Sequence, residues 1–555
     1  MIQPGPEPVP PQRPWLRHYR NGHPSDIEVT PLVVLDLFKS ALARRPDAPA
    51  ILYFDRAVTY AELDRMSDAL AAALGEHGFA AGDRLALYMQ NMPQFLIGVL
   101  AAWKAGGVVV PINPMNRQRE LALMLADARP RAMVCLDSLY DEVVRTLEPE
   151  VPLPDWIVTV SALDLQSRND ARVLPVGTRI DTPKDRLEEV VASHDGRSQP
   201  APRLLPDDPA FLVYTSGTTG IPKAAVLSHR NVAVNAGCIA AWYDLGDDVR
   251  PILGVAPLFH VTGLVGHIAL SWVLAAPLVL QYRFNAEAML EAIAEYRPGF
   301  TVGAITAFIA MMNRPEATPE IFSSFRTIVS GGAPIPPSVI DEFRQRTGRY
   351  IHNGYGLTET SAGIISVPAG SEAPVDPESG TLSIGVPAFG IDAWIAGEDG
   401  HALPPGEVGE IVVSGPQVAA GYWNKPEETA NAMRPDGFRT GDVGFMDKTG
   451  WFYLVDRKKD MINASGYKVW PREVEDVLYG HPAIREVAVV GVPHSYRGET
   501  VRAVVSLKAG ASLSGEDLAA WCRPRMAAYK QPHEILIVDD LPKTAAGKIL
   551  RRNLR

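Results

Sequence analysis

A loop rich in hydroxyl groups and glycines follows the short apolar run of residues 211–214. Glycines let backbone N–H groups approach an anion closely, and hydroxyl groups donate further hydrogen bonds. A lysine at the end of the loop adds a positive charge, which suits a phosphate group. We predict that this loop binds phosphate rather than forming a flexible surface turn, through Thr215, Ser216, Gly217, Thr218, Thr219, Gly220 and Lys223.

This loop is not a Walker A loop. That motif ends in Gly-Lys-Ser/Thr, but here Pro222 precedes the lysine and Ala224 follows it. The expected phosphate site must therefore belong to another class of nucleotide-binding protein.

A second polar segment, residues 353–360, reads Asn-Gly-Tyr-Gly-Leu-Thr-Glu-Thr. Its aromatic ring suits adenine, its hydroxyl groups suit phosphate, and its carboxylate suits a divalent metal ion. Taken alone, Glu359 would be an ordinary solvated loop acid. Its assignment therefore depends on the other motifs in the chain.

The elements around these motifs alternate between strands and helices. Thr59 and Glu62 form a capping box ahead of apolar residues at helical spacing, which predicts a helix from this point. A strand at residues 84–89, a helix through residues 96–103 and a strand at residues 108–110 follow, which indicates α/β layering. Residues 152–206 are rich in Pro, Asp, Ser and Arg, and we expect a surface connection there.

A charged run at residues 456–460 lies between two apolar stretches, and we expect a hinge between domains there. Beyond it, strands are predicted at residues 487–492 and 502–507 and a helix from Ser514. We predict a large multi-layer N-terminal α/β body, residues 1–458, and a small mobile C-terminal α+β domain, residues 459–555.

The amino-acid composition indicates the class of protein and disfavours some partners. The chain has 555 residues, of which 46% are hydrophobic and 21% charged, as in ordinary globular proteins of two or more domains. The formal net charge of -11 disfavours nucleic acid as a partner. The three cysteines lie far apart and predict neither a disulfide framework nor a zinc site, so we expect a reducing, cytoplasmic location.

Neither of two segments has the features of a signal for export or membrane insertion. The first twenty residues contain no apolar core of the kind that a secretory signal needs. Residues 268–280 are apolar, but Ser271 and Pro277 interrupt them, and they are shorter than the roughly 18 residues of a membrane span. We therefore expect residues 268–280 to be buried core.

The sequence Tyr-Thr-Ser-Gly-Thr-Thr-Gly-x-Pro-Lys resembles the signature loop of the adenylate-forming enzymes, the superfamily of acyl-CoA synthetases, peptide-synthetase adenylation domains and firefly luciferase. Ala224 departs from the pattern, because many members have glycine there, and we expect only a local adjustment of the backbone. The resemblance extends from about Leu32 to Arg555 and recurs, in order, at residues 257–263, 330–334, 353–360, 440–442, 456–466 and 542–548.

The resemblance is strongest to fatty-acyl-CoA synthetases, and it implies an ATP-dependent acid–CoA ligase. Such an enzyme forms an acyl-adenylate and then an acyl-CoA thioester, with ATP, Mg²⁺ and coenzyme A. By the same resemblance, the expected partners are these small molecules and a carboxylic acid, without an integral membrane segment. Peripheral membrane contact and a monomeric or homodimeric state stay open.

The resemblance also implies roles in nucleotide binding. Tyr355 stacks on adenine, Asn353 helps to read its amino group, and Glu359 holds the Mg²⁺ that bridges the phosphates. Asp442 suits the ribose diol because a carboxylate accepts two hydrogen bonds. The remaining expected contacts to the nucleotide are Gly331, Gly332, Ala333, Pro334, Gly354, Gly356, Thr358 and Arg457.

Lys548 matches the C-terminal catalytic lysine of the family. Two anions, the substrate carboxylate and the α-phosphate, must approach each other before an acyl-adenylate can form, so a cation that meets both is required. Thr215, Lys223 and Glu359 complete the expected catalytic set. The resemblance places the hinge at Lys459 and the route of the CoA thiol at Gly466, Tyr467 and Lys468.

The acyl pocket is expected at residues 255–264, 301–311 and 329–334, which contain no Asp or Glu. The ammonium group of an amino acid would lack a partner there, which disfavours amino-acid adenylation. We expect a medium- or long-chain fatty acid, with an aromatic or alicyclic acid as the main competitor. Pocket residues implied by the resemblance are His260, Gly263, Gly303, Ala304 and Gly331.

His260 is expected at the mouth of this pocket and not as a general base, because a carboxylic acid is already ionised at neutral pH. The alternatives are a ligase that loads a carrier protein, a luciferase-like oxidation, and a non-catalytic nucleotide-binding relative. A non-catalytic relative would have lost the charged positions, yet the sequence retains Lys223, Glu359, Asp442, Arg457 and Lys548. No carrier-domain motif is evident after Lys548, so we expect a stand-alone acid–CoA ligase rather than an assembly-line module, and a separate carrier protein stays open as the acceptor.

Overall fold

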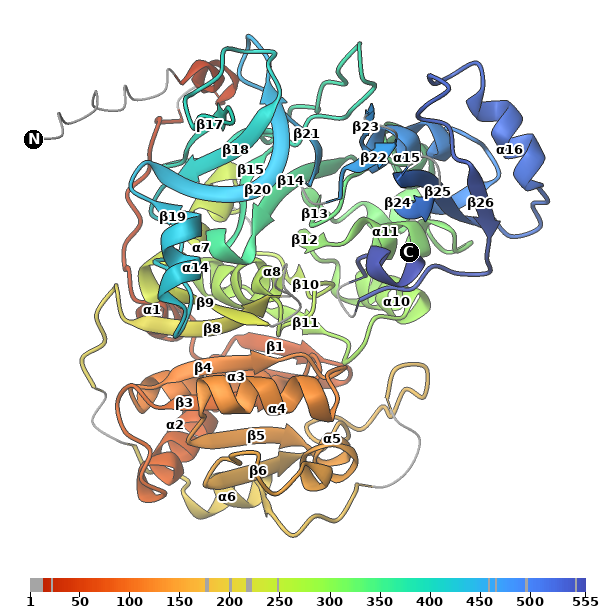
Figure 1. Ribbon diagram of the computed structural model, residues 1–555. Coiled ribbons are helices and arrows are strands. Elements are labelled where there is room, and N and C mark those ends of the chain that lie inside the picture. The colour runs from red at the N-terminus through yellow and green to blue at the C-terminus, as the bar shows by residue number, and fades with distance from the viewer. Residues whose placement is uncertain are drawn as a thin grey trace, which may run out of the picture.

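The computed structural model contains, within the described residues, four β-sheets with helices packed on them (Figure 1). The structure describes residues 13–20, 23–174, 179–198, 202–215, 222–246, 249–457, 460–464, 467–494, 498–544 and 547–555.

The first sheet has seven strands in the order β7-β6-β5-β3-β4-β8-β9, and only the last pair is antiparallel. β4 and β5 are buried at every residue, as expected of parallel strands covered on both faces. The strands are β3 Arg84–Tyr88, β4 Val108–Ile112, β5 Ala132–Leu136, β6 Trp156–Val160, β7 Asp185–Arg186, β8 Pro209–Thr215 and β9 Lys223–Ser228. The helices of this part are α2 Tyr60–Glu76, α3 Pro93–Lys104, α4 Gln118–Ala128, α5 Asp137–Glu142 and α6 Leu187–Ser193.

The second sheet has nine strands in the order β16-β15-β14-β13-β12-β10-β11-β1-β2. Its central strands run parallel, so their carboxyl ends share one edge, where ligands bind in open α/β sheets. The strands are β1 Pro49–Tyr53, β2 Arg56–Thr59, β10 Ile252–Leu253, β11 Leu278–Leu280, β12 Phe300–Gly303, β13 Thr327–Gly331, β14 Ile351–Leu357, β15 Ala362–Ser366 and β16 Val386–Pro387.

The helices around this sheet include one long helical stretch, in which a π-helical turn, Leu264–Ala269, joins α8 to α9. The helices are α1 Val34–Arg44, α7 His229–Trp242, α8 Val261–Gly263, α9 Leu270–Leu274, α10 Ala286–Tyr296, α11 Ile305–Met312, α12 Pro319–Phe322 and α13 Pro337–Thr347. Short 3-10 turns lie at Pro14–His18, Val144–Thr146, Thr358–Thr360 and Arg551–Leu554.

A third, antiparallel sheet follows in the chain and brings two of the predicted site residues together. Asp442 on β20 lies opposite Arg457 on the neighbouring strand β21. The elements are β17 Asp392–Ala396, β18 Gly409–Ser414, α14 Pro426–Ala432, β19 Met433–Arg434, β20 Gly437–Met446 and β21 Phe452–Arg457.

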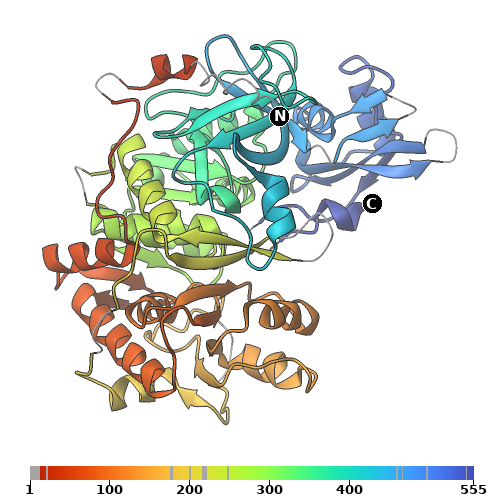
Figure 2. The ribbon, with the colours of Figure 1, turned by 60° about the vertical axis from the view of Figure 1, so that its left-hand side comes forward.

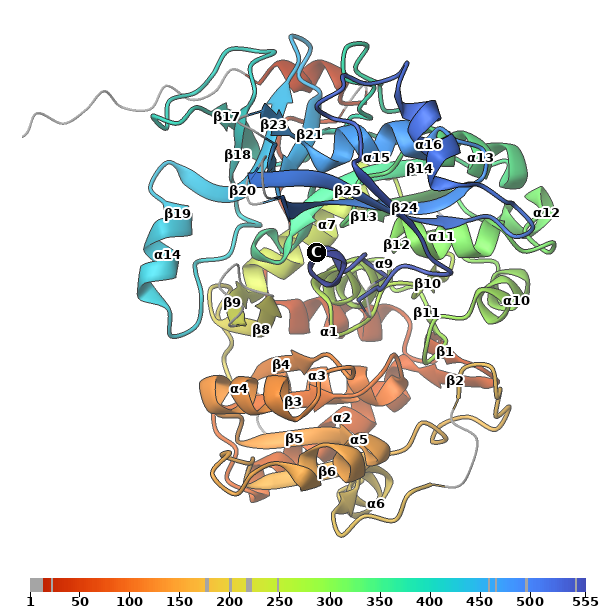
Figure 3. The same ribbon diagram turned by 45° about the vertical axis from the view of Figure 1, so that its right-hand side comes forward.

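The C-terminal part has its own sheet and its own hydrophobic core, which includes Val474, Leu478 and Leu518. Its elements are β22 Ile462–Ala464, β23 Tyr467–Val469, α15 Pro471–Tyr479, β24 Ile484–His494, β25 Gly498–Leu507, α16 Gly515–Cys522 and β26 Glu534–Ile537. In Figure 1 this blue part lies beside the green helix α11, Figure 3 shows it beside both α11 and α13, and Figure 2 shows it from another side. The predicted fold class, a large α/β body with a small α+β part, is confirmed.

Most of the expected elements are confirmed. The Thr59 hydroxyl accepts a hydrogen bond from the Glu62 backbone N–H over 3.1 Å, and the Glu62 carboxylate accepts one from the Thr59 N–H over 2.9 Å, so the capping box starts α2. The predicted strands at residues 84–89, 108–110, 487–492 and 502–507 correspond to β3, β4, β24 and β25.

The interpretation of residues 152–206 as a surface connection is wrong in part. β6 lies in this stretch, between β5 and β7, and all five of its residues are buried. Its apolar run is short, and the polar residues that flank it obscured a central strand of the sheet. Residues 268–280 lie largely in the core, as expected. Among the residues that the structure describes, no helix combines the length and the apolar character needed to cross a membrane.

Candidate functional site

A cavity of about 350 Å³ opens between the carboxyl ends of β12 and β13 and the C-terminal loop that carries Lys548. None of its described lining residues is Asp or Glu. Its lining includes Val255, His260, Phe284, Gly303, Ala304, Thr306, Ala307, Ala310, Gly331, Gly332 and Lys548.

The loop that carries Lys548 is closed on itself and bonded to the body of the protein. The Lys548 backbone N–H donates to the Thr544 hydroxyl over 3.1 Å, and the Thr544 N–H donates to the Lys548 carbonyl over 2.7 Å. The Thr306 hydroxyl on α11 donates to the Gly547 carbonyl over 2.9 Å. The C-terminal part therefore stands in an orientation that delivers Lys548 to the cavity.

Gly332 has no side chain, and the Lys548 side chain occupies the space that a side chain there would fill. A β-carbon at this position would lie 2.6 Å from Lys548 Cε and 3.0 Å from its Nζ. The backbone of Gly332 also has a φ of +80°, which residues with side chains rarely adopt. The predicted turn of residues 330–334 thus lies in direct contact with the predicted catalytic lysine.

His260 lines the cavity as an uncharged ring. It caps α8, where its Nδ1 accepts a hydrogen bond from the Thr262 N–H over 3.3 Å. Burial, and then the nearby charge of Lys548, lower the pKa of His260 to about 3. The imidazole is therefore neutral at physiological pH and a weak base, which suits a residue of the pocket wall.

The predicted pocket residues His260, Gly303, Ala304 and Gly331 line the cavity, whereas Gly263 lies outside its lining. A β-carbon at Gly263 would lie 2.1 Å from the Pro257 carbonyl oxygen, so this glycine serves the packing of its own turn.

Two further wall residues, Ala307 and Ala310, lie three residues apart on α11 and belong to residues 301–311, where the acyl pocket was expected. Sequence reasoning missed a third wall residue, Phe284, which lies outside the predicted pocket segments.

On the adenosine side, the Tyr355 hydroxyl donates a hydrogen bond to Asp442 Oδ2 over 2.8 Å, and both residues are buried. The carboxylate expected to hold the ribose is thus fixed by the ring expected to contact the base. The Asn353 amide N–H₂ donates to the Ser383 carbonyl over 2.9 Å. Its carbonyl oxygen is the group that an adenine amino group would need, because that amino group is a donor.

The remaining nucleotide residues cluster at the ends of two neighbouring strands. Gly331 and Gly354 lie opposite each other on β13 and β14, and a β-carbon at Gly331 would lie 2.7 Å from the Gly354 carbonyl oxygen. Ala333 and Pro334 follow in the loop toward α13. Gly356 lies on β14 and Thr358 opens the short turn that contains Glu359.

At the phosphate end, Thr215 and Lys223 are paired residues at the ends of β8 and β9. The Thr215 hydroxyl donates to the Lys223 carbonyl over 3.3 Å. The predicted phosphate-binding residues Ser216, Gly217, Thr218, Thr219 and Gly220 lie outside the described residues.

Tyr422, which sequence reasoning missed, lies between the two charged groups of this region. The ammonium of Lys223 lies 4.1 Å from the centre of the Tyr422 ring. The hydroxyl of the same ring donates to Glu359 Oε1 over 2.7 Å. Burial, and then the Glu359 carboxylate, raise the pKa of Tyr422, so its hydroxyl stays protonated.

Glu359 fits a magnesium ion that arrives with a nucleotide. Mg²⁺ in such sites binds through one or two carboxylates together with substrate phosphates. Glu359 is only 8% exposed, and the described residues hold no cluster of three His, Cys, Asp or Glu side chains that would form a separate metal cage. Glu359 would hold the ion, which would offset the charge of the phosphates when bound.

Some predicted residues cannot be placed as functional side chains. Lys459 and Gly466 lie outside the described residues. The backbones of Tyr467 and Lys468 form β23, which pairs with β22.

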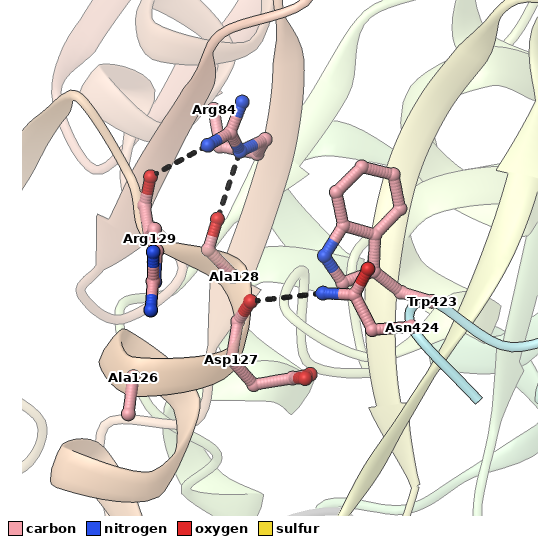
Figure 4. A pocket seen from close by; sticks show the side chains of 7 residues that line it. All are labelled: Arg84, Ala126, Asp127, Ala128, Arg129, Trp423 and Asn424. Carbon is pink, nitrogen blue, oxygen red and sulfur yellow. Dashed lines mark hydrogen bonds between the residues drawn. The ribbon is translucent and has the colours of Figure 1, made fainter.

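A second cavity, of about 240 Å³, lies beside the segment that carries Tyr422 (Figure 4). Asn424 Nδ2 donates to the Asp127 carbonyl over 3.4 Å, and the Arg84 guanidinium lies 6.0 Å from the Trp423 ring centre. Arg84 also donates to the backbone carbonyls of Ala128 and Arg129. These contacts join residues 422–424 to α4 and the start of β3.

Comparison with known proteins agrees with this geometry. The family of AMP-binding enzymes matches residues 38–423, and the AMP-binding enzyme C-terminal domain matches residues 473–548. The chain is 38% identical over 554 residues to a long-chain-fatty-acid–CoA ligase of Bacillus subtilis (strain 168), with 98% of each chain covered. It is 36% identical over 514 residues to a feruloyl-CoA synthase of an Amycolatopsis species, covering 92% of this chain and 96% of that one.

Among solved structures, ATP-bound MatB from Rhodopseudomonas palustris is similar, with a TM-score of 0.80 and 28% identity over 94% of this chain and 98% of that one. The site, the two family matches and the relatives agree on ATP, Mg²⁺ and coenzyme A as the molecules used with a carboxylic acid. The chain belongs to the AMP-binding enzymes, within the adenylate-forming superfamily, as an AMP-forming acid–CoA ligase.

Proposed function

We propose that this ligase activates a medium- or long-chain fatty acid. The observation that carries the proposal is the composition of the cavity lining, in which Lys548 is combined with apolar side chains such as Val255, Ala307 and Ala310. Val255, Ala307 and Ala310 offer no hydrogen bond to a polar tail, so a hydrocarbon chain is the ligand that loses least on entering.

Phe284 supports a tail that reaches past the cavity. It lines the cavity, yet 41% of its surface is exposed, so the apolar wall continues to the outside of the protein. The similarity to a long-chain-fatty-acid–CoA ligase supports the same substrate class.

An aromatic acid is the second candidate, because small side chains such as Gly303 and Ala304 also admit a ring. The similarity to a feruloyl-CoA synthase favours it. An acid whose ring carries polar groups would need hydrogen-bond partners, which Val255, Ala307 and Ala310 do not offer.

In the proposed reaction, Lys548 lies between the substrate carboxylate and the α-phosphate and offsets their repulsion. Lys223 and Thr215 bind phosphate, Asp442 accepts hydrogen bonds from the ribose, and Tyr355 contacts the base. Because these groups are fixed before substrates bind, they contribute mainly by positioning.

For the second step, we propose that the C-terminal domain, residues 459–555, turns about Lys459. Lys548 would leave the cavity, and the CoA thiol would enter along Gly466, Tyr467 and Lys468. The separate core of the C-terminal part supports such a rigid-body movement. The same reasoning applies to a carrier-protein thiol, and acyl transfer to a carrier is the alternative to exclude. The three cysteines are buried free thiols, which supports our proposal of a cytoplasmic location.

The test is a screen of acid-dependent release of pyrophosphate and AMP, with fatty acids of increasing chain length and aromatic acids of increasing ring size. We expect the highest kcat/KM with a medium or long fatty acid and CoA as acceptor. A preference for aromatic acids, or acyl transfer to a carrier protein but not to CoA, would contradict the proposal.

A further inference from the structure

The structure assigns Tyr422 a positioning function in adenylation: it holds Lys223 and Glu359 apart, one on its face and one at its tip. The inference rests on the proposed roles of Lys223 and Glu359 toward the nucleotide and its metal ion. It goes beyond those roles because Tyr422 itself would contact neither the nucleotide nor the metal ion.

The ring of Tyr422 is held in place by its backbone, which lies against β9 like an additional strand. The Val226 N–H donates to the Gly421 carbonyl over 3.0 Å, and the Trp423 N–H donates to the Ala224 carbonyl over 2.9 Å. The Tyr422 N–H donates to the Thr429 hydroxyl over 2.9 Å. This pairing brings Tyr422 next to Lys223, the first residue of β9.

The same segment also fixes the backbone of Glu359. The Ala419 N–H donates to the Glu359 carbonyl over 2.7 Å. The segment is in turn anchored on α7, where the Asn231 amide donates to the carbonyls of Pro416 and Val418 over 2.7 and 3.1 Å. Glu359 is therefore held at both its main chain and its carboxylate by residues 419–422.

The ring of Tyr422 separates two groups of opposite charge, the Lys223 ammonium and the Glu359 carboxylate. Without the ring between them, they could form a direct ion pair, and each would then be withdrawn from its proposed ligand. The face of the ring attracts the ammonium, and the hydroxyl occupies one carboxylate oxygen. The hydroxyl bond to Oε1 can persist while a metal ion binds the other oxygen of the Glu359 carboxylate, whereas a phosphate can draw the Lys223 ammonium away from the ring face.

The two contacts can be separated by substitution. Tyr422→Phe keeps the ring for Lys223 and removes the hydroxyl from Glu359. Loss of a residue that orients a metal ligand typically lowers metal affinity by about 10- to 100-fold. We expect at least a tenfold increase in the Mg²⁺ concentration needed for half-maximal adenylation, with the KM for ATP at saturating Mg²⁺ changed less than about twofold.

Tyr422→Leu removes both contacts. We expect the same loss of metal affinity and, in addition, an increased KM for ATP at saturating Mg²⁺, because Lys223 is then free to pair with Glu359. Tyr453→Phe is the matched control, because the Tyr453 hydroxyl also donates to a carboxylate, that of Asp447 over 3.3 Å, in the third sheet. It should change neither quantity.

Metal binding is also measured without turnover, by electron paramagnetic resonance of free Mn²⁺ during titration of the enzyme with α,β-methylene-ATP present. The inference predicts weaker Mn²⁺ binding in both Tyr422 variants and wild-type binding in Tyr453→Phe, with all variants folded by thermal denaturation. Wild-type Mn²⁺ affinity in Tyr422→Phe would contradict the inference that the hydroxyl orients Glu359 for the metal ion. Equal KM values for ATP in the Phe and Leu variants would contradict the inference that the ring face keeps Lys223 from pairing with Glu359.

Failure of the proposed function gives a different result. In that case the wild-type enzyme itself binds no Mn²⁺ with the nucleotide analogue and forms no AMP, and the inference falls with it. If Tyr422→Leu does not fold, Tyr422→Phe alone still decides the metal-affinity prediction.

Discussion

The Thr306 hydroxyl donates a hydrogen bond to the Gly547 carbonyl oxygen over 2.9 Å, and this bond joins the two parts of the active site. Thr306 lies in the first turn of α11, beside the acyl cavity, and Gly547 precedes Lys548. The position of Lys548 is therefore coupled to the wall of the proposed acyl cavity.

Gly332→Ala should impair acyl-adenylate formation selectively. The new methyl group would lie 2.6 Å from Lys548 Cε, and the φ of +80° is unfavourable for alanine. We expect at least a tenfold lower rate of adenylation, because small misplacements of a catalytic group are costly. Conversion of a supplied acyl-adenylate to the thioester should keep its rate, as measured by thioester formation from synthetic acyl-adenylate and CoA. Equal loss in both steps would show that the backbone of this turn, not Lys548, is affected.

Gly303→Leu should shift the preference toward shorter acids. A β-carbon at Gly303 would lie 2.7 Å from Val255 Cγ1, and both residues line the cavity, so a larger side chain reduces its volume. The ratio of kcat/KM for long and short acids should fall by about 10-fold or more, as expected for one or more lost methylene sites. An unchanged chain-length profile would place the acyl chain elsewhere.

Acid should destabilise the protein because several histidines are buried in neutral form. Burial lowers the pKa values of His229, His267 and His352 to about 4 each. Between the unfolded value near 6.5 and about 4, the unfolded chain binds protons that the native state does not, so the free energy of unfolding decreases as the pH falls. Each group contributes up to about 1.4 kcal/mol per pH unit in this window.

His267→Gln tests this dependence. His267 Nε2 accepts a hydrogen bond from the Ala256 N–H over 3.0 Å, and a glutamine oxygen can replace that acceptor without titrating. Urea unfolding at pH 6 and pH 5 should show a smaller loss of stability in this variant than in the wild type. The same substitution at the exposed His401 is the control for the effect of replacing a histidine by glutamine. An unaltered pH dependence in His267→Gln would mean that His267 is already charged in the native state.

Arg551 should stabilise the C-terminal part through Glu475. Its guanidinium donates to both oxygens of Glu475 over 2.7 Å, while burial raises the pKa of this carboxyl. Arg551→Met leaves Glu475 without this partner and should cost about 3 kcal/mol, at the low end for a buried pair because the Arg551 side chain is 23% exposed. Native-state proteolysis of the C-terminal part measures this loss. Adding Glu475→Gln should recover much of it, and no recovery would assign the loss to packing.

Much of the site could be predicted because each motif carries its chemistry within a few consecutive residues. Lys223, Glu359, Asp442 and Lys548 belong to such motifs, and the fold brings the predicted segments to one region. Tyr422 could not be predicted in this way, because its contacts arise from backbone pairing with β9, which is distant in sequence.

Strands were predicted well where apolar runs were bounded by turn residues, as for β3 and β4. β6 was not predicted because its five buried residues lie in a long polar stretch of the sequence. Its position inside the sheet follows only from its pairing with the neighbouring strands β5 and β7. Gly263 was assigned to the cavity from its motif, whereas close packing against the Pro257 carbonyl explains it. Local pattern therefore predicts which residues the fold brings together at the candidate site better than it predicts which residues support them.

The most direct measurement separates the two half-reactions in Lys548→Ala, with Arg552→Ala as a control that removes an exposed positive charge from the same tail. Removing one preorganised donor typically costs about 10²–10³ in rate, so pyrophosphate release in the adenylation step should fall by that factor. A supplied acyl-adenylate should still react with CoA at the wild-type rate, and Arg552→Ala should match the wild type in both steps. If Lys548→Ala slows both steps equally, or leaves adenylation unchanged, Lys548 is not the cation that brings the carboxylate and the α-phosphate together.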